Sequence, residues 1–278
     1  MGYPTLDAAL AFPNNLLPSE SHIVITDCLN ANANFLIHHF IGNQLKADRK
    51  VILVGLSQIF NHYFHIGRKL GINLQAYKQS GLLCFIDGLT HLNPYAQGSP
   101  YPPAKTPTTP TSVLDASSSN NNDTTMDVLK SFYDVIELQV SAATKENQHP
   151  LLVLDDASVL LMSGFGLEAV QRFIQKLKVM MSRADGALVT VIHADEQGTE
   201  DLEQDAFCRM VMMNASHVLQ VEALNSGLAR DVHGQLSILH GAQQILPNAS
   251  ATVVQSMHFK IADNNVEFFA KGISKGVL

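Results

Sequence analysis

The first residues whose types and spacing point to chemistry lie in residues 22–41, where an apolar run, a polar loop and a second apolar segment follow one another. Strand, tight loop and helix in this order is the arrangement in which P-loop proteins hold nucleotide phosphates, with the motif G-x-x-x-x-G-K-[ST]. On that spacing the two glycine positions fall on Asp27 and Asn32, the lysine position on Ala33 and the hydroxyl position on Asn34. The sequence therefore predicts the outline of a phosphate loop without its chemistry.

An acidic residue in such a loop opposes nucleotide binding. A carboxylate about 4 Å from a phosphate costs on the order of 4 kcal/mol at an effective dielectric near 20. A magnesium ion offsets part of that cost, but it does not replace the lysine and the hydroxyl that anchor phosphate and metal. We therefore expect Asp27, Asn30, Asn32, Ala33 and Asn34 to form a degenerate phosphate loop that does not support hydrolysis. Amides at the start of the following helix can still bind an anion weakly.

A second acidic position follows the apolar run LLVL, where Asp155 and Asp156 stand side by side. In nucleotide hydrolases a carboxylate at the end of an apolar strand holds Mg²⁺. The ordinary interpretation is that acidic residues end strands and cap the next helix. We interpret the pair as a vestigial acidic strand end. The alternative, an ATPase that regulates RNA release, depends on these two residues.

A glycine motif at Gly164, Gly166 and Ala169 matches the dinucleotide fingerprint G-x-G-x-x-A. That fingerprint requires its first glycine directly after a strand, and residues 157–163 intervene here. A free-standing dinucleotide enzyme is a third hypothesis, and this motif is its only support.

Basic residues on one predicted helix face are the candidates for RNA or partner contact. Arg172, Lys176 and Arg183 share that face, although a solvated face is the simpler explanation for them. Arg230 and Lys271 lie beside predicted turns and are further candidates. Lys and Arg number 18 against 25 Asp and Glu, which gives a net charge of −7 and disfavours a dedicated nucleic-acid binder. We predict no catalytic residue and no metal site.

The elements that must position these residues alternate between apolar strands and amphipathic helices. Strands are expected at residues 23–25, 50–58, 82–87, 151–156 and 186–195, with helices between them. Four more strands then follow at residues 217–222, 232–240, 252–261 and 266–270. We predict an α/β, RecA-like domain whose central sheet is mostly parallel, flanked by helices and extended by antiparallel C-terminal strands.

The chain is expected to form one domain over residues 22–278. Residues 1–21 contain Pro4, Pro13 and Pro18 and are predicted to be an irregular N-terminal lead-in. Residues 91–125 hold six of the 11 prolines and the run SSSNNN. Such a stretch cannot bury enough apolar surface to offset its ordering entropy, so a disordered insertion is predicted there.

Cysteine use and the N-terminal residues bear on the compartment. Cys28, Cys84 and Cys208 are far apart and predict neither a disulfide framework nor a zinc site. The N-terminus lacks a basic segment and carries Asp7, which makes it a poor signal peptide. No apolar run approaches the roughly 18 residues of a membrane span. We expect a cytoplasmic protein, also found in the nucleus, with no membrane partner.

Five sequence blocks go beyond this general pattern and resemble the family of subunit six of the Elongator complex. The resemblance spans nearly the whole chain outside the lead-in and the insertion, and its C-terminal block is the most specific. The blocks are FLIHHF at residues 35–40, LGINL at 70–74, LLVLDDASVLL at 151–161, RDVHGQLSIL at 230–239 and VEFFAKGISKGVL at 266–278.

The resemblance implies a fold and a role. Subunits four, five and six are RecA-like proteins that form a heterohexameric ring with two copies of each, and the ring docks on subunits one to three. The complex modifies wobble uridine in tRNA toward 5-methoxycarbonylmethyl and 5-carbamoylmethyl uridine, with the radical and acetyl-CoA chemistry in subunit three. This subunit is then non-catalytic, supports tRNA binding and release, and needs no cofactor of its own, although ATP at a subunit interface remains compatible with it.

Overall fold

Six parallel strands form the centre of the sheet in the computed structural model. They are β1 (His22–Asp27), β2 (Val51–Gly55), β3 (Leu83–Asp87), β4 (Leu151–Asp155), β5 (Ala187–His193) and β6 (His217–Glu222). Every residue of β1, β2 and β4 is buried, as expected of parallel strands covered on both faces. The structure describes residues 2–92, 121–146, 148–194, 201–224, 227, 229–241 and 255–271, with the side chains of 121–127 left out.

Three antiparallel strands extend this sheet. They are β7 (Gly234–His240), β8 (Gln255–Ile261) and β9 (Val266–Ala270), and they follow β6 in the strand order β3-β2-β4-β5-β1-β6-β7-β8-β9. Buried and more exposed residues alternate along β8 and β9, because only one face of these strands is covered. The predicted mixture of a parallel centre and an antiparallel extension is confirmed.

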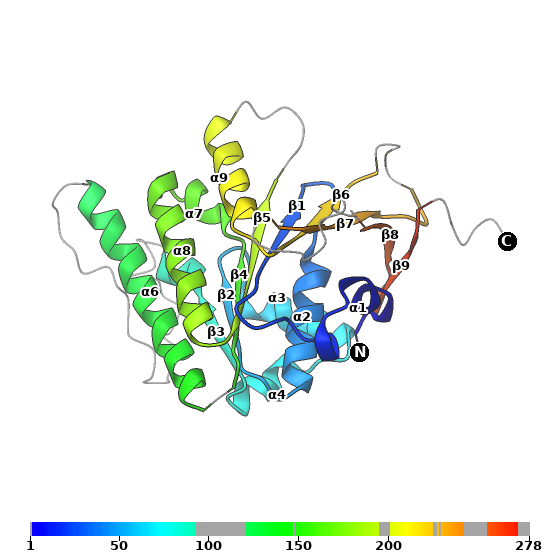
Figure 1. Cartoon of the computed structure of the whole chain (residues 1–278), viewed down its shortest axis with the longest axis horizontal. Coiled ribbons are helices and arrows are strands. Elements are labelled where there is room, and N and C mark those ends of the chain that lie inside the picture. Colours follow the sequence, from blue (N-terminus) through cyan, green and yellow to red (C-terminus); the bar gives the residue numbers. More distant parts are fainter. Residues whose placement is uncertain are drawn as a thin grey trace, which may run out of the picture.

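Helices cover both faces of the parallel strands (Figure 1). Alternate residues of one strand point to opposite faces: Ile23 and Ile25 pack on one side and Val24 on the other. The first side carries α1 (Pro4–Leu10), α2 (Asn34–Lys46), α3 (Phe60–Lys69) and α4 (Leu74–Gln79). The second carries α6 (Asn121–Lys145), α7 (Ser158–Met162), α8 (Leu167–Arg183) and α9 (Leu202–Met213), while the short α5 (Gly88–His91) follows β3.

The first 21 residues are more ordered than predicted. They contain α1 and a short 3₁₀ helix at Pro13–Asn15. Pro4 occupies the first turn of α1, where its missing amide is not needed, so this proline starts a helix rather than breaking one. Tyr3 stacks on His39 with ring centroids 4.9 Å apart, and Leu6 is fully buried. The prediction of irregular backbone was wrong for Pro4–Leu10, which is helical.

The predicted insertion lies mostly outside the described residues, which exclude 93–120. The described residues on either side of residues 93–120 are helical or follow a helix directly: α5 ends at His91 and α6 begins at Asn121.

None of the helices in the described part of the chain combines the length and the apolar character that crossing a membrane requires.

Candidate functional site

The predicted acidic residues meet at one edge of the sheet. The strand order places β1 beside β5 and β5 beside β4, all parallel, so their carboxyl ends lie together. Asp27 ends β1, Asp155 ends β4, and His193 ends β5 directly opposite Asp27 in the strand register. In open α/β sheets, ligand sites lie outside this edge. The candidate site is therefore the β1–α2 loop together with these strand ends.

The loop after β1 folds back on itself. The amide of Ala31 donates to the carbonyl of Cys28 at 3.0 Å, and the amide of Cys28 donates to the carbonyl of Ala31 at 3.3 Å. The amide of Asn34 donates to Oδ1 of Asn32 at 2.7 Å. Asn30 lies exposed in the loop. Three amides that a phosphate cradle would offer to its ligand are thus bonded within the loop.

A fourth amide of the loop donates a hydrogen bond to a carboxylate of the protein itself. Oδ2 of Asp27 accepts the amide hydrogen of Ala33 at 3.0 Å, at the start of α2. The Nδ1–H of His193 donates to Oδ1 of the same carboxylate at 2.8 Å. Asp27 is only 5% exposed. The favourable position for an anion at the N-terminus of α2 is consequently taken by Asp27.

The lysine position of the motif is part of the core. Ala33 is fully buried and belongs to the apolar cluster that includes Phe35 and Leu36. A lysine side chain at this position would have to enter that cluster, where an unpaired ammonium group is strongly unfavourable. The loop thus differs from the P-loop motif in residue type, and its lysine position is buried.

The two strand-end carboxylates are bonded to neighbouring residues. The Tyr63 hydroxyl donates to Oδ2 of Asp155 at 2.6 Å, and burial raises the pKa of Asp155 to about 7. Oδ1 of Asp156 accepts the amide hydrogen of Ser158 at 2.9 Å, next to the start of α7. Burial also raises the pKa of Asp156 to about 6. Asp156 therefore accepts a hydrogen bond from the first residue of α7, while Ala157 occupies the N-cap position of that helix.

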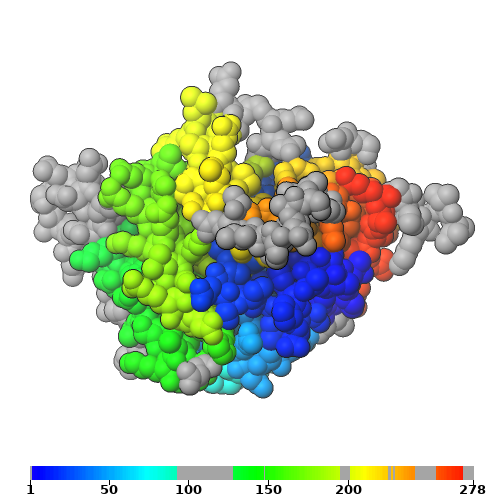
Figure 2. Space-filling model, in the orientation of Figure 1, coloured from blue at the N-terminus to red at the C-terminus, as the bar shows by residue number. Residues whose placement is uncertain are grey.

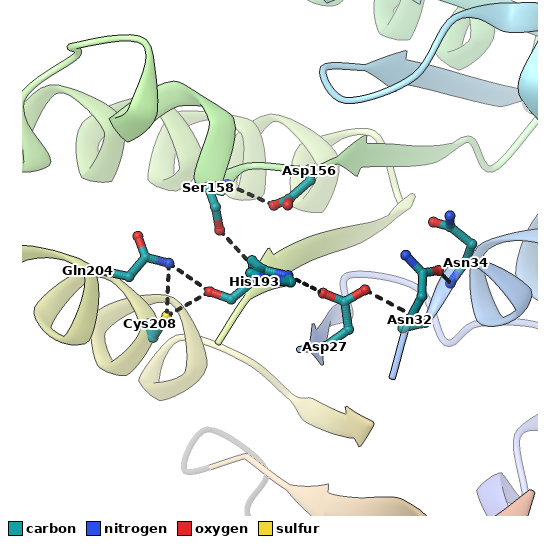
Figure 3. A network of polar contacts seen from close by, with 9 residues as sticks. Asp27, Asn32, Asn34, Asp156, Ser158, His193, Gln204 and Cys208 are labelled. Carbon is teal, nitrogen blue, oxygen red and sulfur yellow. Dashed lines mark hydrogen bonds and ion pairs between the residues drawn. The ribbon is translucent and has the colours of Figure 1, made fainter. Parts of the chain in front are cut away.

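Four further residues complete a polar network that sequence reasoning missed (Figure 3). The amide of His193 donates to Oγ of Ser158 at 2.8 Å, and the His193 carbonyl accepts from Nε2 of Gln204 at 2.6 Å. Cys208 also donates to that carbonyl. Asp27 and His193 are 166 residues apart, and only the strand order brings them together. The predicted strand over residues 186–195 was the available signal for His193, once β5 is known to adjoin β1.

The predicted basic residues separate into two groups. Arg172, Lys176 and Arg183 line one groove between α6 and α8. Arg230 precedes β7 and Lys271 follows β9, both exposed on the antiparallel extension. The structure therefore brings together three of the five candidates.

The remaining motifs lack the setting their chemistry needs. Gly164 and Gly166 follow α7 rather than a strand, so the dinucleotide fingerprint has no strand-to-helix turn. Within the described residues, no group of three His, Cys, Asp or Glu side chains is arranged to hold a metal ion.

A nucleotide triphosphate does not fit the loop of this chain as it is folded. Four loop amides have internal partners, the lysine position is buried, and Asp27 puts a negative charge at the helix start. The arrangement joins β1, β5, α7 and α9 by hydrogen bonds.

Comparisons with known proteins agree along nearly the whole chain. A family model described as Elongation complex protein 6 matches residues 3–263. Elongator complex protein 6 of Rattus norvegicus is 34% identical over 99% of this chain and 100% of its own length. The Homo sapiens protein of the same name is 33% identical over 89% of each chain.

The fold has a solved counterpart. The crystal structure of a KaiC-like protein from Pyrococcus horikoshii superposes with a TM-score of 0.57 and covers 91% of each chain. At 13% identity this match shows the fold alone, and it confirms the RecA-like prediction. With the family model and the full-length relatives in agreement, the chain belongs to the family of Elongation complex protein 6.

Proposed function

We propose that this chain is a non-catalytic subunit of Elongator that builds a RecA-like ring with subunits four and five, two copies of each. The ring docks on subunits one to three and supports tRNA binding and release during wobble uridine modification. In this proposal the protein works in the cytoplasm and also in the nucleus, without a cofactor of its own.

The observation that carries the proposal is the closed β1–α2 loop. Asp27 bonds the Ala33 amide where a phosphate would bond in an active relative. A chain that keeps the sheet edge of a nucleotide site but fills its anion position can still offer that edge to a neighbouring subunit. Structural use of the edge, rather than catalysis, is the function this geometry supports best.

The same edge carries exposed apolar side chains. Leu29, Met162 and Leu202 are each 81% exposed, and Ile59 is also exposed. Each lies in the segment that follows a different parallel strand, namely β1, β2, β4 or β5. Exposed apolar side chains in the segments that leave the carboxyl ends of neighbouring strands are candidates for a protein interface. A neighbouring ring subunit would cover them.

Co-expression with subunits four and five tests this proposal. We expect one complex whose mass by light scattering matches two copies of each subunit, and which binds tRNA. Met162→Glu combined with Leu202→Glu should reduce incorporation at least tenfold, because charges would be buried at the interface. Met213→Glu is the control, since Met213 is 69% exposed at the other end of α9. A stable monomer that ignores both partners would contradict the proposal.

A second candidate function is an ATPase that regulates RNA release. Asp155 and Asp156 at the end of β4 favour it, because a neighbouring subunit can complete a site at this edge. ATP turnover of the assembled ring with and without Asp155→Asn separates the two functions. Unchanged turnover supports the non-catalytic role, and a loss of turnover supports the ATPase.

A further inference from the structure

The groove between α6 and α8 has no part in the closed loop or in the apolar edge beside it. It has a volume of about 920 Å³ and runs between two helices that lie side by side (Figure 1; green and yellow-green at the surface in Figure 2). Its lining residues run from Tyr133 to Lys145 on α6 and from Arg172 to Ala184 on α8. At 1.5 Å per residue these stretches are each roughly 18 Å long, which matches about three turns of a helix.

The middle of the groove is apolar. Val140 and Met180 are buried beneath it, and Val179 stands beside them with half of its surface exposed (50%). An exposed valine in the centre of a helix-lined groove is the kind of anchor point that a partner helix covers with its own apolar face.

The rim of the groove is basic. Four cations line it, Lys145, Arg172, Lys176 and Arg183, against one lining carboxylate, Glu137. Glu168 offsets part of the charge of Arg172, to which it is paired at 2.5 Å, whereas the structure gives Lys145, Lys176 and Arg183 no ion pair within the described residues. The groove is thus locally positive, in contrast to the whole chain, which has a net charge of −7. The local charge therefore selects for an acidic occupant.

We propose that the α6–α8 groove binds an acidic amphipathic helix from another Elongator protein. The apolar stripe of that helix covers Val179 and Met180, and its carboxylates face Lys176, Arg183 and Lys145. RNA fits less well. The Tyr133 ring already lies under the Lys176 ammonium, with the ammonium 5.9 Å from the ring centroid, so this ring is not open to stack on a base.

Photo-crosslinking in the complete complex tests this inference. The photo-reactive amino acid p-benzoylphenylalanine replaces Val179 in the full chain, and this chain is assembled into Elongator. After irradiation, the crosslinked peptide is sequenced by mass spectrometry. We expect a segment of another subunit with apolar residues at helical spacing and a net negative charge. A crosslink to tRNA, to a second copy of this chain or to a non-acidic segment would overturn the inference, as would the absence of any crosslink.

Charge reversal provides the matched control. Lys176→Glu combined with Arg183→Glu should lower the crosslink yield at least tenfold, while Arg209→Glu, an exposed arginine on α9, should leave it unchanged. An equal yield in all three proteins would also contradict the inference. Ring assembly is measured by light scattering in the same samples, so failure at the groove is distinguishable from failure of the ring proposal.

Discussion

Nδ1 of His193 lies 2.8 Å from Oδ1 of Asp27, and this contact joins the ends of two adjacent parallel strands beside the loop that a nucleotide would occupy. The other oxygen of the same carboxylate accepts the amide hydrogen of Ala33, the residue just before α2. One buried side chain thus holds the loop closed from two sides.

Asp27→Ala is expected to lower the free energy of unfolding by roughly 2–4 kcal/mol, because it removes the acceptor of the buried Ala33 amide and the partner of His193 together. Asp27→Asn keeps a carbonyl oxygen for the Ala33 amide and should cost about half as much. Urea denaturation of the two variants gives both values. An Ala variant as stable as the wild type would contradict the role assigned to this carboxylate.

Ala33→Lys should destabilise the fold by roughly 3 kcal/mol or more, because the new side chain enters a filled apolar cluster. It should not create ATP binding. Asn30→Lys adds the same charge to an exposed position of the same loop and should change stability by less than about 0.5 kcal/mol. Thermal melts with and without Mg-ATP check both statements, and an Ala33→Lys protein that melts like the wild type would refute the first.

The raised pKa of Asp155 predicts a pH dependence of stability. The folded carboxyl keeps its proton up to about pH 7, whereas the unfolded one loses it near pH 4. Folding therefore binds a proton in this window, and the free energy of unfolding falls as pH rises from about 4 to 7, by about 1.4 kcal/mol per unit at most for this group. Above pH 7 the contribution of this group no longer changes.

Asp155→Asn should flatten that dependence and leave a protein more stable than the wild type at pH 8. Asp48→Asn, which changes the same charge at an exposed position, should keep the wild-type slope. Guanidinium denaturation at pH 5, 6, 7 and 8 measures the slopes. The interpretation fails if the Asp155→Asn protein and the wild type lose stability equally with rising pH.

Tyr63→Phe removes the hydroxyl that donates to Asp155. The free energy of unfolding should fall by about 1.5–3 kcal/mol at pH 8, where the buried Asp155 carboxylate is ionised. The decrease should be smaller at pH 5, where Asp155 is protonated. In the Asp155→Asn background this difference between the two pH values should disappear. A loss in the single variant that is equal at both pH values would show that the hydrogen bond does not favour the charged form.

Much of the fold was predictable from residue patterns. The apolar runs at residues 23–25 and 151–154 predicted buried parallel strands, and the strands after residue 217 predicted the antiparallel extension. Helix α1 was missed because three prolines suggested irregular backbone, whereas Pro4 stands where a helix accepts proline.

The candidate site was predictable in composition but not in contacts. The sequence showed that other residues stand at the glycine, lysine and hydroxyl positions of the motif, namely Asp27, Asn32, Ala33 and Asn34. The partners of Asp27 were not, because His193 reaches it through a strand order that no local pattern encodes. Likewise, the basic face of α8 was visible in the sequence, but its groove depends on α6 packing beside it.

The most direct measurement is a calorimetric titration of the isolated full-length chain with Mg-ATP. With Asp27 bonded to the Ala33 amide, we expect no saturable heat up to millimolar ATP. Micromolar binding that weakens when Asn32 and Asn34 are replaced by alanine would contradict the account, because it would place the triphosphate in the loop that Asp27 closes.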